Sequence, residues 1–222
     1  MDETLLLLKK LGFAPRRIID AGANQAQWAE IASLIFPDAR LHLIEPQPAC
    51  QPALEEFAEA HAGTQIHRVA LTEGGKPTVT MFAVDASGSS GAFVGSLEVF
   101  ASELKPVRLP ATTLDELFAA QVSVEDRALL KLDLEGHELP ALRGARRLLT
   151  QAEVLVTEAH IFAPAAWQRS VFGAIAAELE ENGFELFDIA SLSGRARDAR
   201  LRIGDFVFVN KTSPLLKDRE WS

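Results

Sequence analysis

The stretch Arg17-Ile18-Ile19-Asp20-Ala21-Gly22-Ala23-Asn24 decides which fold the sequence predicts. Its apolar run is typical of a buried strand, Gly22 indicates a tight turn after it, and residues 25–34 repeat apolar side chains at helical spacing. A strand, a glycine turn and a helix N-terminus together make a place where a ligand can approach bare backbone N–H groups. We therefore expect a ligand-binding site at this turn.

A carboxylate follows at the position where nucleotide-binding folds contact a ribose. Residues 41–44 (LHLI) predict a second buried strand, which ends at Glu45, about twenty residues beyond the turn. In a Rossmann unit an acidic residue at this distance binds the ribose hydroxyls. Glu45 therefore supports the prediction of a nucleotide-like ligand.

The residues after Gly22 bear on which nucleotide would bind. A dinucleotide site needs further glycines in the turn, so that the chain can press against a pyrophosphate and pack closely on the helix. Here Ala23, Asn24, Gln25 and Ala26 follow instead. S-adenosylmethionine has a ribose and an adenine but no phosphate, so this turn favours S-adenosylmethionine over NAD.

Length and composition predict one soluble α/β domain. The chain has 222 residues, of which 48% are hydrophobic, enough for a full core. A net charge of −9 argues against DNA or RNA as a partner. The single cysteine, Cys50, excludes an internal disulfide and fits a reducing cytoplasm. The apolar run 5–8 is too short for a signal peptide or membrane span, and we interpret it as a short helix that ends near Gly12.

Strands and helices alternate along the chain, which predicts a parallel sheet with right-handed crossovers. Further strands are expected at 65–71, 78–84, 107–110, 128–134, 153–158, 184–189 and 205–209, and helices at 48–60, 114–120, 138–149 and 167–181. Residues 85–95, rich in Ser and Gly, could form either a flexible linker or a lid over the ligand.

Acidic and histidine residues follow two consecutive strands of this predicted sheet. Asp133, Glu135 and His137 end one strand, and Glu158 and His160 end the next. Ligands of open α/β sheets bind at the carboxyl ends of the strands, so these side chains should surround one cleft. We expect the cleft to orient an acceptor hydroxyl and take its proton, with a histidine as base because its pKa lies nearest neutrality. Each residue also has a structural interpretation, such as closing the start of a helix.

The same side chains offer a second chemistry. Asp133, Glu135 and Glu158 carry the oxygen ligands that Mg²⁺ or Ca²⁺ prefers, and His160 could add a nitrogen. The sequence has no dense ligand-spacing motif, so a metal is an alternative and not the prediction.

Several segments together resemble the FkbM-type methyltransferases. The matching segments are 18–24 (IIDAGAN), Glu45-Pro46, 69–71 (VAL), Ser89-Ser90, 113–117 (TLDEL), 130–138 (LKLDLEGHE) and 158–160 (EAH). The resemblance runs from about Leu11 to Val209, and the segment 131–138 is its most specific part. Ala26 departs from the pattern, because the family more usually has glycine there; we expect binding to be tolerated, with a shifted helix start.

The resemblance implies a class I methyltransferase (Rossmann-like) fold of the α/β class. This fold has a seven-stranded, mostly parallel sheet with a terminal antiparallel hairpin and helices on both faces. We expect one domain over residues 1–222, with an N-terminal helix at 1–12 and an inserted hairpin and loop region at 74–110 over the site. The implied reaction is methyl transfer from S-adenosylmethionine to a hydroxyl of a small molecule, sugar or glycan, in a cytoplasmic protein without nucleic acid or membrane partners.

The resemblance also implies a set of site residues. Cofactor contacts are expected at Asp20, Gly22, Ala23, Asn24, Glu45, Pro46, Ala70, Leu71, Ser89, Ser90 and Asp133, and catalytic roles at Asp133, Glu135, His137, Glu158 and His160. Two other functions stay open: a non-catalytic adaptor that binds the cofactor, and an NAD-dependent oxidoreductase. The missing glycines and the absence of tyrosine weigh against the oxidoreductase.

Overall fold

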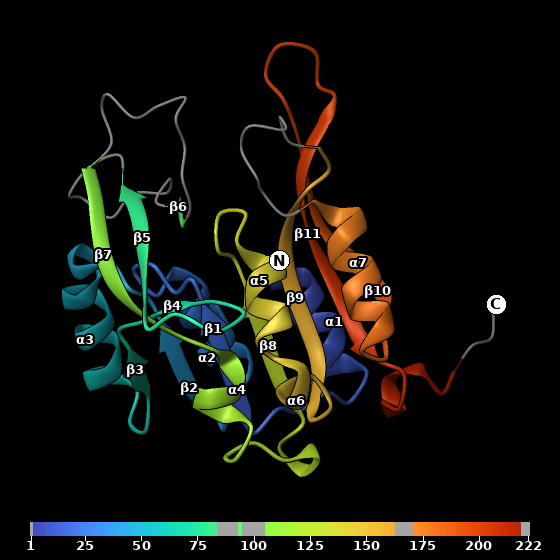
Figure 1. Cartoon of the computed structure of the whole chain (residues 1–222). Coiled ribbons are helices and arrows are strands. Elements are labelled where there is room, and N and C mark those ends of the chain that lie inside the picture. The colour runs from blue at the N-terminus through green and yellow to red at the C-terminus, as the bar shows by residue number, and fades with distance from the viewer. Residues whose placement is uncertain (1, 84–92, 95–104, 163–170, 219–222) are drawn as a thin grey trace.

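The structure is a computed structural model that describes residues 2–83, 93–94, 105–162 and 171–218. Its centre is a seven-stranded sheet in the order β10-β11-β9-β8-β1-β2-β3. These strands are β1 (Arg17–Ala21), β2 (Arg40–Ile44), β3 (Gln65–His67), β8 (Ala128–Leu132), β9 (Ala152–His160), β10 (Phe184–Gly194) and β11 (Leu201–Asn210). Figure 1 shows this sheet with the hairpin of β10 and β11 rising beyond the other strands.

The strand directions confirm the predicted fold class. β1 pairs in parallel with β2 and β8, and the parallel pairing continues from β2 to β3 and from β8 to β9. β11 runs antiparallel to both β9 and β10. The sheet is therefore mostly parallel, with one antiparallel strand contributed by a terminal hairpin, as the resemblance implied.

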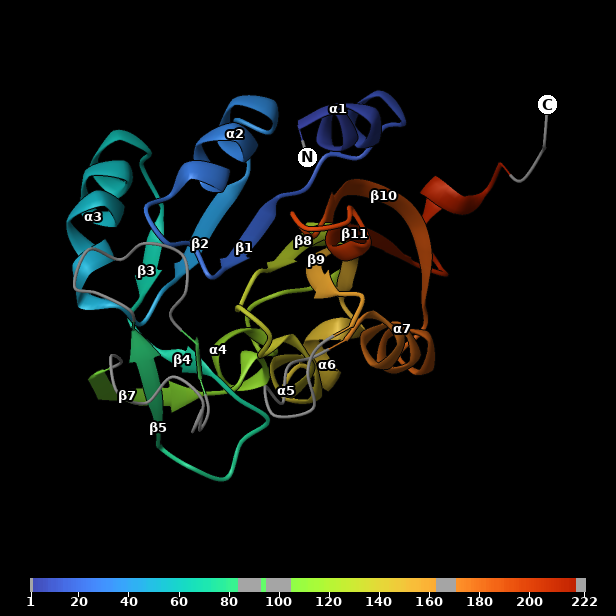
Figure 2. The same ribbon diagram turned by 90° about the horizontal axis from the view of Figure 1, so that it is seen from above.

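Helices cover both faces of this sheet (Figure 2). On one face lie α1 (Asp2–Lys10), α2 (Gln27–Ile35) and α3 (Gln51–Ala60), and on the other α4 (Leu114–Phe118), α5 (Glu138–Arg143), α6 (Arg146–Leu149) and α7 (Phe172–Glu181). Short 3-10 helices occupy Pro48–Cys50, Val124–Asp126 and Pro214–Leu216. Adjacent residues of a strand point to opposite faces, so Ile18 packs into the core under α1 to α3 and Ile19 into the other core.

A second, four-stranded sheet lies beside the main one, in the order β4-β7-β5-β6. Its strands are β4 (Ala70–Leu71), β5 (Thr78–Ala83), β6 (Phe93–Val94) and β7 (Lys105–Thr112). The prediction of one strand over 65–71 is wrong, because β3 pairs with β2 while β4 pairs with β7 in the other sheet. Most of the Ser- and Gly-rich stretch 85–95 lies outside the described residues.

The predicted helix over 138–149 is interrupted at Gly144, which separates α5 from α6. A side-chain Cβ at Gly144 would lie 2.2 Å from the backbone oxygen of Thr72, so the close approach of these two segments requires glycine. Among the described residues, no helix combines the length and the apolar character needed to cross a membrane.

Candidate active site

A pocket with a volume of about 140 Å³ lies at the carboxyl ends of β1, β2 and β8. Such ends are where open α/β sheets bind their ligands. Five segments supply its walls: the turn after β1, the end of β2, β4 with the residue before it, β5 and the turn after β8. The described lining residues are Gly22, Asn24, Ile44, Glu45, Pro46, Gln47, Val69, Ala70, Leu71, Met81, Asp133, Leu134, Glu135 and His137.

Gly22 brings two of these walls together. Its φ of +83° lies in the left-handed region that favours glycine, and a Cβ at this position would lie 1.8 Å from the backbone oxygen of Asp133. A hydrogen bond of 3.0 Å from the Asp133 N–H to the Ala21 carbonyl joins the same two turns. The glycine therefore allows the turn after β1 to lie directly against the turn after β8.

The backbone N–H groups of this turn are all engaged within the protein. Those of Gly22 and Ala23 donate to the Ile44 carbonyl, that of Asn24 donates to Glu45 and that of Ala26 donates to the Ala23 carbonyl. The N–H of Gln25 donates to the side chain of Gln27. The expectation of bare N–H groups is therefore wrong, because the end of β2, Glu45 and residues of the turn itself satisfy them. The turn is thus not arranged to cradle a phosphate.

Ala26 also has a left-handed conformation, with φ +65°, and precedes α2 as its N-cap residue. The helix begins at Gln27, two residues later than the apolar spacing suggested.

Glu45 is held rigidly at the edge of the pocket. Its side chain is 4% exposed. Oε2 accepts the Asn24 N–H at 3.1 Å and Oε1 accepts the Gln47 N–H at 2.9 Å. Burial raises the pKa of Glu45, and the hydrogen bonds from Gln47 and Asn24 oppose that shift. The side chain of Gln47 also bonds to Glu45. A carboxylate has about four acceptor positions, so Glu45 retains acceptor capacity for a ligand.

The turn after β8 forms the acidic wall of the pocket. Asp133, Glu135 and His137 all line it. Glu135 and Gly136 have positive φ angles, and Oε1 of Glu138 accepts the N–H groups of Leu134 and Gly136. Glu138 therefore closes this turn. Burial raises the pKa of Glu138 to about 7.

His137 combines a position in the pocket with a ring nitrogen that has no partner. Within the described part of the chain, its Nε2 is buried and makes no hydrogen bond. Burial lowers the pKa of His137, an effect that the charge of Glu73 partly opposes. The ring is therefore neutral at neutral pH and able to accept a proton or a hydrogen bond.

Glu158 and His160 lie at the end of β9, outside the set of described lining residues. Burial, followed by the charges of Asp133 and Glu135, raises the pKa of Glu158 to about 8. Glu158 therefore lies close to the acidic wall and is mostly protonated at neutral pH. His160 is buried, with 6% exposure. The structure thus brings Glu158 close to the predicted cluster but does not bring His160 to the pocket.

Two predicted cofactor residues, Asp20 and Ala23, are buried and are not among the described lining residues. Ser89 and Ser90 lie outside the described residues. Gly22, Asn24, Glu45, Pro46, Ala70, Leu71 and Asp133 all line the pocket. In the described ranges, no three His, Cys, Asp or Glu side chains are placed to hold a metal ion together.

Lys131 is a site-related residue that the sequence analysis did not single out. Its ammonium lies 3.0 Å from Asp20 Oδ1 and 3.4 Å from Asp133 Oδ2, and it donates a hydrogen bond of 3.0 Å to the Gly22 carbonyl. A lysine between leucines in the strand sequence ALLKLDL indicated a buried charge that needs partners.

Comparison with known proteins agrees with this geometry. The model of the methyltransferase FkbM domain matches residues 20–186, which is more than half of the chain. The chain belongs to the FkbM methyltransferase family. No curated protein gives a significant match.

Solved structures show the fold of this FkbM family member. A methyltransferase FkbM from Methylobacillus flagellatus KT superposes with a TM-score of 0.53 at 15% identity, over 86% of this chain but only 43% of that protein. The N-methyltransferase NodS from Bradyrhizobium japonicum WM9, in complex with S-adenosyl-L-homocysteine, has a TM-score of 0.54 at 10% identity, over 94% of this chain and 85% of its own. A putative sarcosine dimethylglycine methyltransferase from Galdieria sulphuraria has a TM-score of 0.56 at 9% identity, over 95% of this chain and 85% of its own. The fold is therefore that of the class I methyltransferases.

Proposed function

We propose that this FkbM family member transfers a methyl group from S-adenosylmethionine to a hydroxyl of a small molecule, sugar or glycan. The observation that carries the proposal is Glu45, a buried carboxylate at the edge of the pocket that has more acceptor positions than its hydrogen bonds to Asn24 and Gln47 use. Adjacent ribose hydroxyls are donors that match these positions. The engaged N–H groups of the Gly22 turn support a ligand without a pyrophosphate, which disfavours NAD.

The pocket residues suggest how such a cofactor would lie. Ile44, Leu71 and Met81 offer an apolar surface suited to an adenine ring. Gly22 and Asn24 line the part of the wall suited to the methionine end. Asp133 and Glu135 would then face the positively charged sulfonium, whose methyl group is the electrophile that S-adenosylmethionine supplies. The protein contributes alignment, exclusion of water and a base.

Calorimetric titration with S-adenosylhomocysteine tests the cofactor. We expect saturable micromolar binding by the wild type. Glu45→Ala should bind about ten- to a hundredfold more weakly, because a lost charge-assisted hydrogen bond costs about 1.5–3 kcal/mol. Glu55→Ala is a matched control, since Glu55 lies exposed on α3 and pairs with Arg68. A folded wild type that binds no S-adenosylhomocysteine would refute the proposed cofactor.

His137 is our candidate for the base that takes the acceptor proton. Its place in the pocket, its unpaired Nε2 and its lowered pKa support this role. With an acceptor found by screening hydroxylated compounds, His137→Ala should lose at least about a hundredfold in turnover, the usual contribution of a positioned base, while S-adenosylhomocysteine binding is retained. His61→Ala is the control, because His61 lies at the end of α3 and bonds to Phe57 and Ser33. Unchanged turnover in His137→Ala would exclude this histidine as the base.

A further inference from the structure

Lys131 occupies an unusual place for a charged residue. It is the last residue but one of β8, is 6% exposed, and points into the apolar layer between the sheet and α2. The neighbouring strand β1 places Asp20 directly opposite it, and Asp20 is 0% exposed. A buried ion pair in such a layer contributes little net stability, because both charges lose their hydration. A function other than stability therefore needs to be considered for this pair.

The contacts of the ammonium group indicate that function. Three oxygen atoms lie near the ammonium. The Gly22 carbonyl accepts a hydrogen bond from it, and Asp20 Oδ1 and Asp133 Oδ2 form ion pairs with it. Gly22 belongs to the turn after β1 and Asp133 to the turn after β8, and both line the pocket. The Lys131 side chain, which does not line the pocket, therefore links two of its walls.

Asp20 and one aromatic ring fix the position of the ammonium. The fully buried Asp20 carboxylate lies 3.0 Å from it. The Trp28 ring at the start of α2 lies 5.8 Å from the ammonium and covers it. Burial favours the neutral amine, but the charges of Asp20 and Asp133 outweigh this and raise the pKa of Lys131. The group is thus a permanent cation held between two carboxylates.

We propose that Lys131 is a positioning residue that sets the separation of the Gly22 turn and the Asp133 turn, and thereby the shape of the cofactor pocket. This inference rests on the proposed function, since the ligand is S-adenosylmethionine or its product. Lys131 acts through Gly22 and Asp133, with Asp20 as its buried counter-ion, and does not itself line the pocket.

The test separates positioning from stability. Lys131→Met alone would leave the Asp20 carboxylate buried without its counter-charge, and this variant can fail to fold. The double variant Lys131→Met/Asp20→Asn removes both charges and keeps similar volumes, so we expect it to fold. Its affinity for S-adenosylhomocysteine, measured by calorimetry, should fall at least about tenfold, because the link between the two turns through the ammonium is then lost.

Leu129→Ala is the matched control. Leu129 lies on the same strand and the same face, two residues before Lys131, and is fully buried. Its truncation should lower the free energy of unfolding while the affinity for S-adenosylhomocysteine stays within about twofold of the wild type. A second neutral pair, Lys131→Gln/Asp20→Asn, should also bind weakly and provides the measurement if the methionine variant does not fold.

The outcomes distinguish this inference from the proposed function. Wild-type affinity in either folded double variant would overturn the positioning role and leave the proposed cofactor intact. An equal loss of affinity in Leu129→Ala would also overturn it, because stability alone would then explain the effect. A wild type that does not bind S-adenosylhomocysteine would overturn the proposed function and this inference together.

Discussion

Gly22 and Glu45 shape the pocket through the backbone around them. The conformation of Gly22 lets its turn lie against the Asp133 carbonyl. Glu45 accepts a hydrogen bond from the N–H of Asn24 in the same turn. Both residues could be selected from the sequence, one as a turn and one as a strand-end acid. The hydrogen bonds of Gly22 to the Ile44 carbonyl and of Asn24 to Glu45 depend on β1 and β2 being adjacent, which only the folded chain shows.

At the scale of the residue, Gly22→Ala should destabilise the protein strongly. The new Cβ would meet the Asp133 backbone oxygen, so the two turns must separate, and the left-handed φ adds its own cost. We expect a loss of about 2–4 kcal/mol in the free energy of unfolding, measured by chemical denaturation, and weakened binding of S-adenosylhomocysteine.

Gly63→Ala is the control for this prediction. Gly63 has a similar φ of +88°, but a Cβ there would meet nothing within 4 Å. This substitution should cost only the backbone strain of about 1–2 kcal/mol. Equal losses in the two variants would mean that the contact with Asp133 does not constrain the turn.

At the scale of secondary structure, three strands bring carboxylates together at one edge of the sheet. Glu158 on β9 lies opposite Asp205 on β11, and Asp133 and Glu135 follow β8. Burial and these neighbouring charges raise the pKa of Glu158 to about 8, from an ordinary 4.5. The folded state therefore binds the proton of Glu158 more tightly than the unfolded state does.

This shift predicts how stability depends on pH. An acid with a raised pKa stabilises the fold below its unfolded pKa, and that stabilisation disappears as the pH rises through the folded value, here about 8. Between pH 7 and pH 9 we expect Glu158 to account for a loss of about 1 kcal/mol in the free energy of unfolding. Glu158→Gln should remove that part of the loss in denaturation experiments at the two pH values.

Glu59→Gln is the comparison for this variant, because Glu59 lies exposed on α3. It should leave the wild-type pH dependence unchanged. If Glu158→Gln loses as much stability as the wild type between the two pH values, Glu158 is already ionised at pH 7 in the folded protein.

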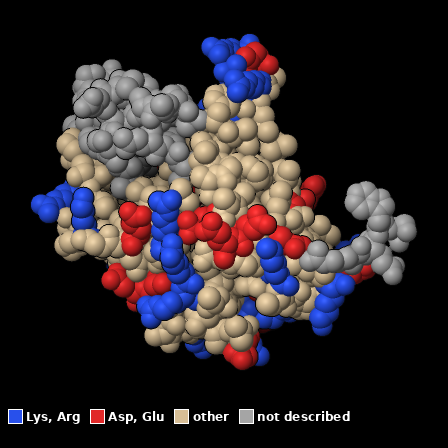
Figure 3. Space-filling model, turned by 45° about the vertical axis from the view of Figure 1, so that its right-hand side comes forward, with Lys and Arg blue, Asp and Glu red and all other residues tan. Residues whose placement is uncertain are grey.

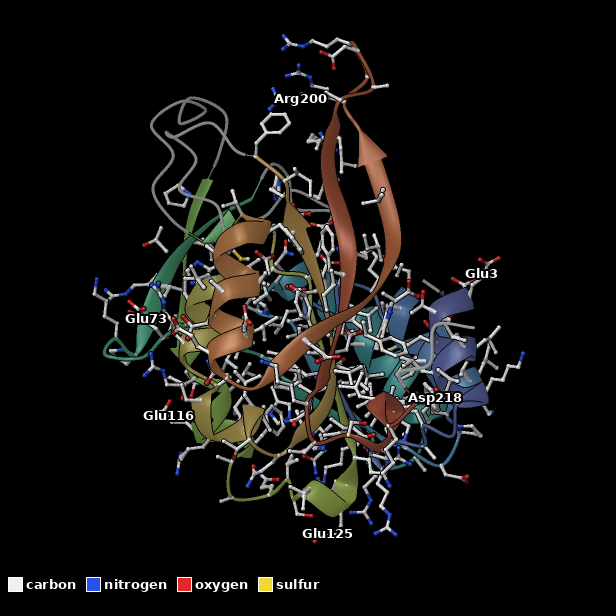
Figure 4. The ribbon with its side chains drawn as sticks, turned by 90° about the vertical axis from the view of Figure 1, so that its right-hand side faces the viewer. Glu3, Glu73, Glu116, Glu125, Arg200 and Asp218 are labelled. Carbon is white, nitrogen blue, oxygen red and sulfur yellow. The ribbon has the colours of Figure 1, made fainter. Side chains whose placement is uncertain are left out.

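At the scale of the whole molecule, the terminal hairpin extends beyond the rest of the main sheet. Pairing of β11 with β9 ends at Ile203 and His160, while β10 and β11 continue beyond that point as a two-stranded ribbon. Figure 3 shows a group of basic and acidic side chains at the end of this ribbon, and acidic side chains across the middle of the same face. Figure 4 shows Arg200 near the end of the ribbon, at the opposite extreme of the molecule from Glu125. The guanidinium of Arg200 lies over the Phe162 ring, 4.2 Å from its centroid.

Much of this architecture could be predicted from the sequence. Buried strands such as β1 and β8 are continuous apolar runs, so their place and order along the chain were correct. The two strand ends with Glu45 and Asp133 were correctly expected at one site. These predictions succeeded because hydrophobic periodicity and turn residues are local properties of the chain.

Other features depended on contacts between distant segments. The break between β3 and β4 arises because Ala70 and Leu71 pair with β7, which lies about forty residues later in the chain. The sequence by itself determined the family, the order of strands and helices, and the acidic strand ends. Only the tertiary structure decided that His137 lines the pocket while His160 is buried, and that Lys131 joins two turns, because burial and hydrogen bonding are set by the strands and helices that pack around each side chain.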